Sequence, residues 1–308
     1  MEKGTVIKST GSRYTVKTES GSVYYCSIRG RFRIRGIRAT NPVAVGDRVS
    51  FEPGIEGAGG TITSIEERSN YIIRRSSNLS REYQLVACNV DLAWLMVTLL
   101  EPRTFTAFID RFLVSAQAYR IPVIILFNKT DLYGEDELDE LEDLLEIYRG
   151  AGYDCLTLSL KNMKGLEEVR SLMKDKLNVL AGNSGVGKST LINSLDPAFS
   201  IKTGDISESH GTGRHTTTYA EMYQLEGEMR IIDTPGIRGF GMVDIDKEEL
   251  FHFFPEIFRA SNDCKYHNCM HVNEPGCHVK EEVLAGRISE SRYLNYLMMM
   301  EEEEGKYR

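Results

Sequence analysis

A glycine-rich segment in the middle of the chain constrains the fold more than any other feature. It reads Gly182-Asn183-Ser184-Gly185-Val186-Gly187-Lys188-Ser189. The apolar residues Val179–Ala181 before it are expected to form a strand, and a helix is expected to begin at Lys188. A strand, a glycine-rich turn and a helix in this order form a loop whose backbone N–H groups point inward, where they bind phosphate groups. The segment therefore predicts an α/β domain with a phosphate-binding loop.

The side chains of this loop supply further contacts to a nucleotide. Lys188 places a fixed positive charge beside the β- and γ-phosphates, which also makes it a candidate catalytic residue. The Ser189 hydroxyl is expected to ligate Mg²⁺. The nucleotide contacts predicted from this segment are Asn183, Ser184, Gly185, Val186, Gly187, Lys188, Ser189 and Thr190.

A second motif, Asn128-Lys129-Thr130-Asp131, follows the apolar strand expected at Val123–Phe127. The Asp131 carboxylate can accept two hydrogen bonds from the N1–H and the exocyclic amine of guanine, and adenine offers no such pair. The Lys129 stem can cover the plane of the base. An ordinary loop is the alternative, because these residue types are common after strands. The predicted base contacts are Asn128, Lys129 and Asp131, with Ser159 and Lys161, after a strand expected at Cys155–Leu158, as a second set.

A third motif, Asp233-Thr234-Pro235-Gly236, lies about 50 residues beyond the phosphate loop. Asp233 follows an apolar strand and is expected to hold Mg²⁺ through water, while the Gly236 amide meets the γ-phosphate. A plain β-turn is the alternative, because Asp, Pro and Gly all favour turns. Of the threonines at 216–218, Thr217 is favoured as a further Mg²⁺ ligand when GTP is bound. Together the three motifs describe a GTP site.

The third motif does not supply the residue that orients the attacking water. Many GTPases carry a glutamine directly after this glycine, but the residue here is Ile237, whose aliphatic side chain cannot position water. His215, in the polar, glycine-rich segment 200–218, is the candidate for a water-orienting or general-base role. A histidine without a catalytic task is the alternative. Intrinsic turnover is expected to be slow.

The order of the motifs predicts a circularly permuted domain. In an ordinary GTPase the phosphate loop comes first, whereas here the base-reading motif at 128–131 precedes the loop at 182–189. Strand-like and helical stretches alternate between about residues 71 and 243, which is typical of a parallel sheet with helices on both faces. The acidic run Glu135–Glu146 is expected to be a solvated helix face. The central GTPase domain is assigned to residues 69–245.

Residues 1–68 are expected to form a separate β domain. Short strands divided by glycine and turn residues favour a small barrel, and a five-stranded OB-type barrel is the first choice. The expected strands are Gly4–Lys8, Arg13–Thr18, Val23–Ile28, Phe32–Arg38, Arg48–Glu52 and Gly60–Ile65.

A run of arginines in this part predicts RNA binding. Arg29, Arg31, Arg33 and Arg35 recur at every second residue, so they share one face of a strand, and Arg38 adds a fifth charge. Residues 1–70 hold 11 Lys/Arg and seven Asp/Glu, although the whole chain has a net charge of −8. A charged edge strand that prevents aggregation is the alternative. The run contains no balancing acid, which favours RNA.

A cysteine cluster near the C-terminus predicts a structural zinc site. Cys264, Cys269, His271 and Cys277 lie within 14 residues and can supply the four ligands of one tetrahedral Zn²⁺ per chain. His267 and His278 are competing ligands, and unrelated free cysteines are the alternative. The segment has few apolar residues, so a metal would supply folding energy. Residues 246–308 are expected to form a mostly helical zinc-binding domain.

The ends and the composition of the chain predict its location. No apolar run approaches ~18 residues, the length that crosses a membrane. The N-terminus lacks the apolar core of a signal peptide. We therefore expect a cytoplasmic protein with no membrane contact.

The motif order, the barrel before it and the Cys-x4-Cys-x-His-x5-Cys module behind it resemble the ribosome small-subunit-dependent GTPase A family of bacteria over nearly the whole chain. The resemblance implies a cytoplasmic GTPase that acts late in small-subunit maturation and is strongly stimulated by the subunit. It implies contacts to ribosomal RNA through the barrel and the zinc module, and it makes His215 the counterpart of the histidine proposed as catalytic in the family. Leu160 is a departure, because a small residue is usual between Ser159 and Lys161.

Two other function classes are the alternatives. The first is a nucleotide-gated RNA-binding factor in which hydrolysis is incidental, and turnover with and without small subunits separates it from the GTPase. The second is a zinc-dependent DNA-binding protein, which ranks low because no recognition-helix pattern follows the cluster. DNA is therefore not an expected partner, and the chain is expected to act as a monomer.

Overall fold

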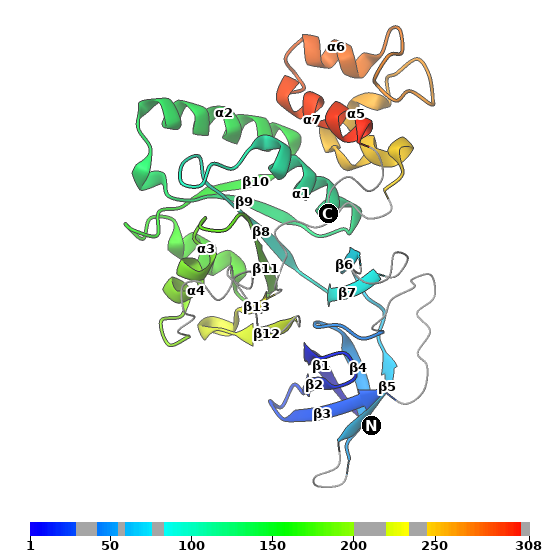
Figure 1. Cartoon of the computed structure of the whole chain (residues 1–308), viewed down its shortest axis with the longest axis vertical. Helices are drawn as coiled ribbons and strands as arrows, with labels where there is room; N and C mark the ends of the chain where they lie inside the picture. The colour runs from blue at the N-terminus through cyan, green and yellow to red at the C-terminus, as the bar shows by residue number, and fades with distance from the viewer. Residues whose placement is uncertain (29–41, 55–58, 76–82, 200–219, 234–244, 303–308) are drawn as a thin grey trace, which may run out of the picture.

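Three parts follow one another in the computed structural model, which describes residues 1–28, 42–54, 59–75, 83–199, 220–233 and 245–302. A barrel lies at the N-terminal end of the elongated molecule, a sheet covered by helices lies in the middle, and a helical part lies at the far end (Figure 1). The domain boundaries expected near residues 68 and 245 stay predictions.

The N-terminal part is a barrel, as predicted. Its described strands are β1 (Glu2–Ser9), β2 (Tyr14–Lys17), β3 (Val23–Ile28), β4 (Arg48–Glu52) and β5 (Gly60–Ile65). They pair in the order β1-β2-β3-β5-β4, and β4 closes the ring by pairing with β1. Val6, Val16, Phe51 and Ile62 are buried in its interior. A small closed barrel of five described strands fits the OB type.

The middle part is built on a mostly parallel sheet, as predicted. Its strands are β8 (Leu92–Val97), β9 (Val123–Phe127), β10 (Asp154–Thr157), β11 (Leu177–Ala181), β12 (Glu221–Gln224) and β13 (Arg230–Asp233). Their order is β10-β9-β8-β11-β13-β12, and β12 is antiparallel to β13. The helices that cover one face are α1 (Thr106–Ala118) and α2 (Glu135–Ala151), and those on the other are α3 (Leu166–Met173) and α4 (Lys188–Leu195) (Figure 1). Of these six strands β8 comes first along the chain, and yet it lies between β9 and β11 rather than at an edge of the sheet.

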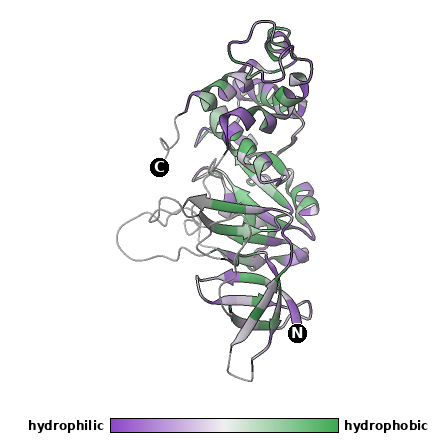
Figure 2. Ribbon diagram, turned by 90° about the vertical axis from the view of Figure 1, so that its right-hand side faces the viewer, coloured by the Kyte–Doolittle hydropathy of each residue, from purple (hydrophilic) through white to green (hydrophobic). Residues whose placement is uncertain are grey.

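The residues of β8 alternate between the two faces of the sheet. Leu95 and Val97 join the cluster that includes Phe112 of α1, whereas Trp94 and Met96 join the cluster of α3 and α4. All of β8 is buried, which is typical of a central strand covered on both faces. Figure 2 shows hydrophobic stretches running through the strands of this sheet. The sheet is thus the rigid core that holds the loops at its edges.

The acidic helix α2 turns one side to solvent, as predicted. It buries Leu141, Leu144 and Tyr148 against the sheet, and its acidic residues are exposed or half-buried. This division of the helix surface is the usual one for a helix that covers a sheet.

Strands that the sequence did not indicate join the barrel to the sheet. The strands β6 (Tyr71–Arg75) and β7 (Tyr83–Cys88) form an antiparallel pair, and Val45 bridges Ala87 of β7. The edge strand β12 pairs with both β13 and β1, so eleven of the described strands form one continuous sheet. A strand of four residues such as β12 is too short to show a clear pattern of its own, so its neighbours decide its pairing.

The C-terminal part is mostly helical, as predicted. Its elements are the 3-10 helix η3 (Lys247–Phe253), α5 (Pro255–Ser261), α6 (His278–Leu284) and α7 (Glu290–Glu301). Its core includes Phe254, Ile257 and Tyr296 and also takes in Val114 of α1, so this part packs on the helices of the sheet. Within the described ranges, none of the helices combines the length and the apolar character that crossing a membrane requires.

Candidate nucleotide site and metal centre

The glycine-rich segment forms a tight loop between β11 and α4, as predicted. A side chain at Gly182 would place its Cβ 2.4 Å from the backbone oxygen of Met96, and one at Gly187 would place it 2.5 Å from Nδ2 of Asn128. Both glycines have positive φ, +134° and +108°, which other residues rarely adopt. Glycine is required at both positions because the loop lies against the ends of β8 and β9.

Lys188 begins α4 with its ammonium turned back over the loop. Its Nζ donates to the backbone oxygens of Gly182 and Asn183, each at 2.8 Å. Ser189 is half-buried and Thr190 is exposed in the same first turn, where backbone N–H groups have no intrahelical acceptor. The first-turn amides, the helix dipole and the lysine charge together suit this loop to bind phosphate groups.

Asn128 ties the base-reading loop to the phosphate loop. It is buried at the end of β9, and its Nδ2 donates to the backbone oxygen of Val186 at 2.8 Å. The Tyr133 hydroxyl donates to the backbone oxygen of Asn128 at 2.8 Å and holds the loop from its other side. The Oδ1 atom of Asn128 is buried and has no hydrogen-bond partner among the described residues. Such an acceptor fits a site that a polar ligand completes.

Asp131 lies in the short helix η1 (Thr130–Leu132), and Ser159 orients its carboxylate. The Ser159 hydroxyl donates to Oδ1 at 2.7 Å, and Nζ of Lys161 lies 4.0 Å from Oδ2. The hydrogen bond from Ser159 is the main cause that lowers the pKa of Asp131, and the charge of Lys161 acts in the same direction. The carboxylate is therefore ionised at neutral pH and able to accept the two donors of guanine.

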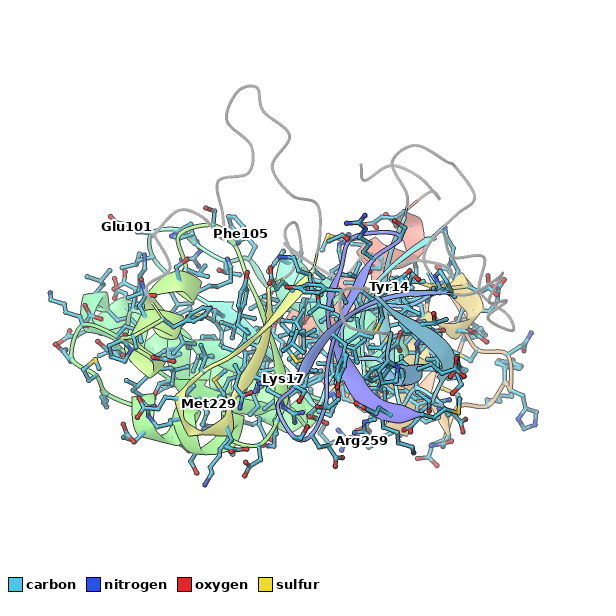
Figure 3. The ribbon with its side chains drawn as sticks, turned by 90° about the horizontal axis from the view of Figure 1, so that it is seen from below. Tyr14, Lys17, Glu101, Phe105, Met229 and Arg259 are labelled. Atoms are coloured by element: carbon cyan, nitrogen blue, oxygen red, sulfur yellow. The ribbon has the colours of Figure 1, made fainter. Side chains whose placement is uncertain are left out.

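A loop after β8, residues 98–105, forms a further wall of the site that the sequence motifs did not reveal. Nζ of Lys129 donates to the backbone oxygen of Glu101. Cδ of Pro102 lies 3.5 Å from the position that a Cβ on Gly185 would occupy. Figure 3 shows Glu101 and Phe105 at one edge of the central part. The available signal was that this loop follows a central parallel strand, because ligands bind at the carboxyl ends of such strands.

Motifs far apart in the sequence meet at this edge of the sheet. The carboxyl ends of β8, β9, β10 and β11 carry loop 98–105, the motif at 128–131, Ser159 with Lys161, and the phosphate loop. The structure therefore brings the described nucleotide-binding candidates into one site, at the place where parallel α/β sheets bind ligands.

Other predicted residues lie outside the described part of the chain. The backbone of Asp233 ends β13 opposite Glu221 of β12, but its side chain is not described. The remaining ones are His215, Thr217 and Gly236 of the nucleotide site, and Arg29, Arg31, Arg33, Arg35 and Arg38 of the RNA-binding face with the strand Phe32–Arg38. Their roles stay predictions.

The Cys/His cluster forms a cage of four ligand atoms. The ligand atoms of Cys264, Cys269, His271 and Cys277 all lie within 4.8 Å of one another. Cys264 Sγ lies 3.9 Å from Cys277 Sγ, and His271 Nδ1 lies 3.6 and 3.5 Å from these two sulfurs. Tetrahedral zinc with ordinary bond lengths requires S···S separations of about 3.8 Å and S···N separations of about 3.6 Å. The cage therefore fits a tetrahedral metal ion.

The protonation chemistry of the cage also fits a metal. Burial raises the pKa of the Cys269 thiol to about 12 and raises that of Cys277, which keeps both thiols protonated by themselves. A cation between them would offset this burial cost and stabilise the thiolates that bind metal. Burial lowers the pKa of His271, which favours the neutral, metal-binding imidazole. Of the competing histidines, His278 lies within 3.9 Å of three carboxylates and His267 is exposed. Neither belongs to the cage.

Comparison with known proteins identifies the family. The family model of the RsgA GTPase matches residues 65–243, and that of the RsgA N-terminal domain matches residues 3–62. The chain belongs to the RsgA GTPase family. It is 53% identical to the small ribosomal subunit biogenesis GTPase RsgA of Christiangramia forsetii, over 99% of this chain and 98% of that protein. RsgA 2 of Bacteroides thetaiotaomicron is 54% identical over 99% of both chains.

Two solved structures share the fold of this chain. YjeQ from Thermotoga maritima matches with a TM-score of 0.79 at 36% identity, over 97% of both chains. YloQ, a circularly permuted GTPase, matches with a TM-score of 0.75 at 32% identity, over 97% of this chain and 94% of its own. The family resemblance and the permuted motif order are thereby confirmed. As an RsgA GTPase, the chain hydrolyses GTP.

Proposed function

We propose that this chain binds the small ribosomal subunit, hydrolyses GTP in late maturation of that subunit and is stimulated by it. The observation that carries the proposal is a guanine-reading carboxylate, Asp131, beside a phosphate loop on a sheet that continues into an OB-type barrel. The named relatives that support it are small ribosomal subunit biogenesis GTPases.

Each residue of the nucleotide site is proposed to have a separate role. Asp131 selects guanine, and the Lys129 stem covers the base while its Nζ binds the Glu101 oxygen. Lys188 offsets the charge that develops on the phosphates during transfer. Ser189, Thr217 and Asp233 are the proposed holders of Mg²⁺, an ion that neutralises phosphate charge in such sites. His215 is proposed to position the attacking water.

The barrel is proposed to bind RNA, and the C-terminal part is proposed to be stabilised by a metal. The arginine face of the barrel, formed by the basic run at residues 29–38, is proposed to bind ribosomal RNA. The cage of Cys264, Cys269, His271 and Cys277 is proposed to hold one zinc ion, which stabilises the C-terminal part. We further propose three domains with boundaries near residues 68 and 245, a monomeric state and a cytoplasmic location, and we expect no DNA partner.

Stimulated hydrolysis tests the proposal. GTP turnover is measured with purified small and large ribosomal subunits side by side, and we expect slow intrinsic turnover that the small subunit alone raises. His215→Ala is expected to lower the stimulated rate about 10²- to 10⁴-fold while GTP affinity stays within twofold of the parent's, because a general base acts on the chemical step. Equal rates with and without subunits would favour a nucleotide-gated RNA-binding factor, which the aliphatic Ile237 makes the second candidate.

A further inference from the structure

The first strand of the barrel continues into the sheet of the central part. The first half of β1 pairs with β4 inside the barrel. Its register with β2 shifts between Val6 and Lys8, and Lys8 lies opposite Glu221 of β12. An irregularity of this kind bends a strand and re-aims it. The end of β1 is thereby directed from the barrel to the edge strand of the sheet.

Two polar contacts reinforce this junction. Lys8 Nζ lies 2.8 Å from Glu221 Oε2, with both side chains about one-third exposed, at 38% and 33%. Lys17 of β2 donates through Nζ to Gln224 Oε1 at 2.8 Å. Figure 3 shows Lys17 where the barrel meets the β12–β13 pair. The contacts Lys8–Glu221 and Lys17–Gln224 are called the barrel seam below.

The strand on the far side of the seam borders the catalytic segments. β12 directly follows residues 200–219, in which His215 and Thr217 lie, and its Glu221 is opposite Asp233 at the end of β13. β13 in turn pairs with β11, the strand that ends in the phosphate loop. β12 is therefore joined by pairing to the strand that ends at the proposed metal-side aspartate, and along the chain to the segment that contains the proposed general base.

The barrel is also anchored elsewhere, independently of the seam. Arg68 binds the fully buried Asp47 with its Nε 2.6 Å from Oδ1. Asn89 Nδ2 donates to the backbone oxygen of Gly46 at 2.9 Å, and Val45 bridges β7. These contacts hold the barrel on the hairpin of β6 and β7. Substitutions in the seam should therefore change how the barrel is coupled to β12 without detaching the barrel.

We propose that the barrel seam transmits the binding of RNA on the barrel to the hydrolytic site, with Glu221 and Gln224 as positioning residues that act through β12. The inference rests on the proposed function, because it names the route of the stimulation. Binding at one site influences another when an element between them responds to both. β12 is that element, since it is hydrogen-bonded to the barrel on one edge and to β13 on the other.

The test removes the contacts of the barrel seam by substituting the two residues on β12, so that the barrel, which carries the proposed RNA-binding face, keeps its own sequence. In the double variant Glu221→Ala/Gln224→Ala we measure GTP turnover without subunits (basal) and with small subunits (stimulated). We also measure the affinity for the small subunit in the absence of nucleotide. Basal turnover and affinity are expected within twofold of the parent, and stimulation is expected to fall about three- to tenfold, because exposed contacts of this kind are each worth up to about fivefold in an equilibrium constant. The swapped pair Lys8→Glu/Glu221→Lys is expected to recover more than half of the stimulation that Glu221→Ala loses.

A matched control lies in the barrel itself. Lys3 pairs with Glu66 at 2.8 Å, and it lies on the first half of β1, which pairs with β4 rather than with β12. Lys3→Ala is expected to keep full stimulation. The inference is overturned if the double seam variant is stimulated like the parent, or if Lys3→Ala loses as much stimulation. A parent protein that no subunit stimulates would instead refute the proposed function, and the inference with it.

Discussion

At the residue scale, we expect the base preference of the site to depend on one oriented carboxylate. Ser159 holds Asp131 at 2.7 Å, and this hydrogen bond lowers the pKa of Asp131. The two donors on one edge of guanine are thus expected to meet a charged acceptor that a protein side chain already orients. Hydrogen bonds to charged groups contribute about 1.5–3 kcal/mol each, so a pair of them can decide between guanine and another base.

Asp131→Asn replaces one acceptor oxygen by an amide donor that faces the donors of guanine. We expect the affinity for GTP to fall about 100-fold or more. The affinity for xanthosine triphosphate is expected to rise, because its base carries an oxygen where guanine has the amine. Competition against a fluorescent guanine nucleotide measures both. Asp136→Asn, on the exposed side of α2, is the control that should change neither affinity. An Asp131→Asn protein that still prefers GTP contradicts the assignment.

Ser159→Ala tests the orientation of the carboxylate through pH. The Ser159 hydrogen bond lowers the pKa of Asp131, so its removal should raise that pKa toward the ordinary value. On acidification from neutral pH, the variant carboxylate then loses its charge at a higher pH than in the parent, and GTP binding weakens earlier. Carboxyl carbon NMR of Asp131 and parallel binding titrations measure the two effects. An unchanged Asp131 pKa would show that Ser159 does not set it.

At the element scale, a buried ion network fastens the C-terminal helices to the helical layer of the sheet. Arg292 of α7 lies with Nη1 2.6 Å from Oδ1 of Asp110 on α1, and with Nε 2.7 Å from Oε1 of Glu256 on α5. Burial by itself lowers the pKa of Arg292, but the two carboxylates outweigh it and raise the pKa well above the ordinary value. The arginine side chain is 1% exposed, so water cannot replace a lost partner.

Arg292→Ala leaves Asp110 and Glu256 buried without their cation. We expect a loss of about 3–5 kcal/mol in the free energy of unfolding of the C-terminal part, seen as lower hydrogen-exchange protection in α1, α5 and α7. Arg287→Ala is the control, because the Arg287 side chain is 64% exposed in its pair with Glu282 and such pairs contribute about 1 kcal/mol or less. Equal losses of unfolding free energy in the two variants would show that the buried network does not stabilise the C-terminal part more than an exposed ion pair does.

At the scale of the whole molecule, the three parts are joined by different means. The barrel is joined by strand pairing with β12 and by the buried Asp47–Arg68 pair, whereas the C-terminal part is joined by Val114 and the Arg292 network. The described residues of the nucleotide site all come from the central part. The C-terminal part should therefore be able to loosen without loss of nucleotide binding.

Metal removal tests this division. The purified protein is expected to hold one zinc ion per chain by elemental analysis. Chelation should lower hydrogen-exchange protection across residues 262–280 and η3, because three thiols and an imidazole lose the ion that holds them together. Affinity for GTP should change by less than about threefold. A chelated protein with unchanged protection, or one that no longer binds GTP, would contradict this account.

Local pattern was enough to predict most elements of the fold. Strands bounded by turn residues were predicted with their observed ends, as at Val23–Ile28, Arg48–Glu52 and Val123–Phe127. Their apolar alternation or continuous apolar run is a property of the segment itself. The edge strand Glu221–Gln224 was missed because four residues are too few to show a clear pattern. The hairpin of β6 and β7 was missed because its role depends on contacts with its neighbours and not on its own sequence.

By itself the sequence determined the predicted chemistry: Asp131 as the guanine reader, a phosphate-binding loop with Lys188 and four metal ligands. These predictions depend on residue types at close spacing. Only the tertiary structure decided that Ser159 orients Asp131, that the Glu101 oxygen binds Lys129, and that β1 continues into β12. Each of these contacts joins residues far apart along the chain. Strand order and packing bring them together, and no local pattern carries that information.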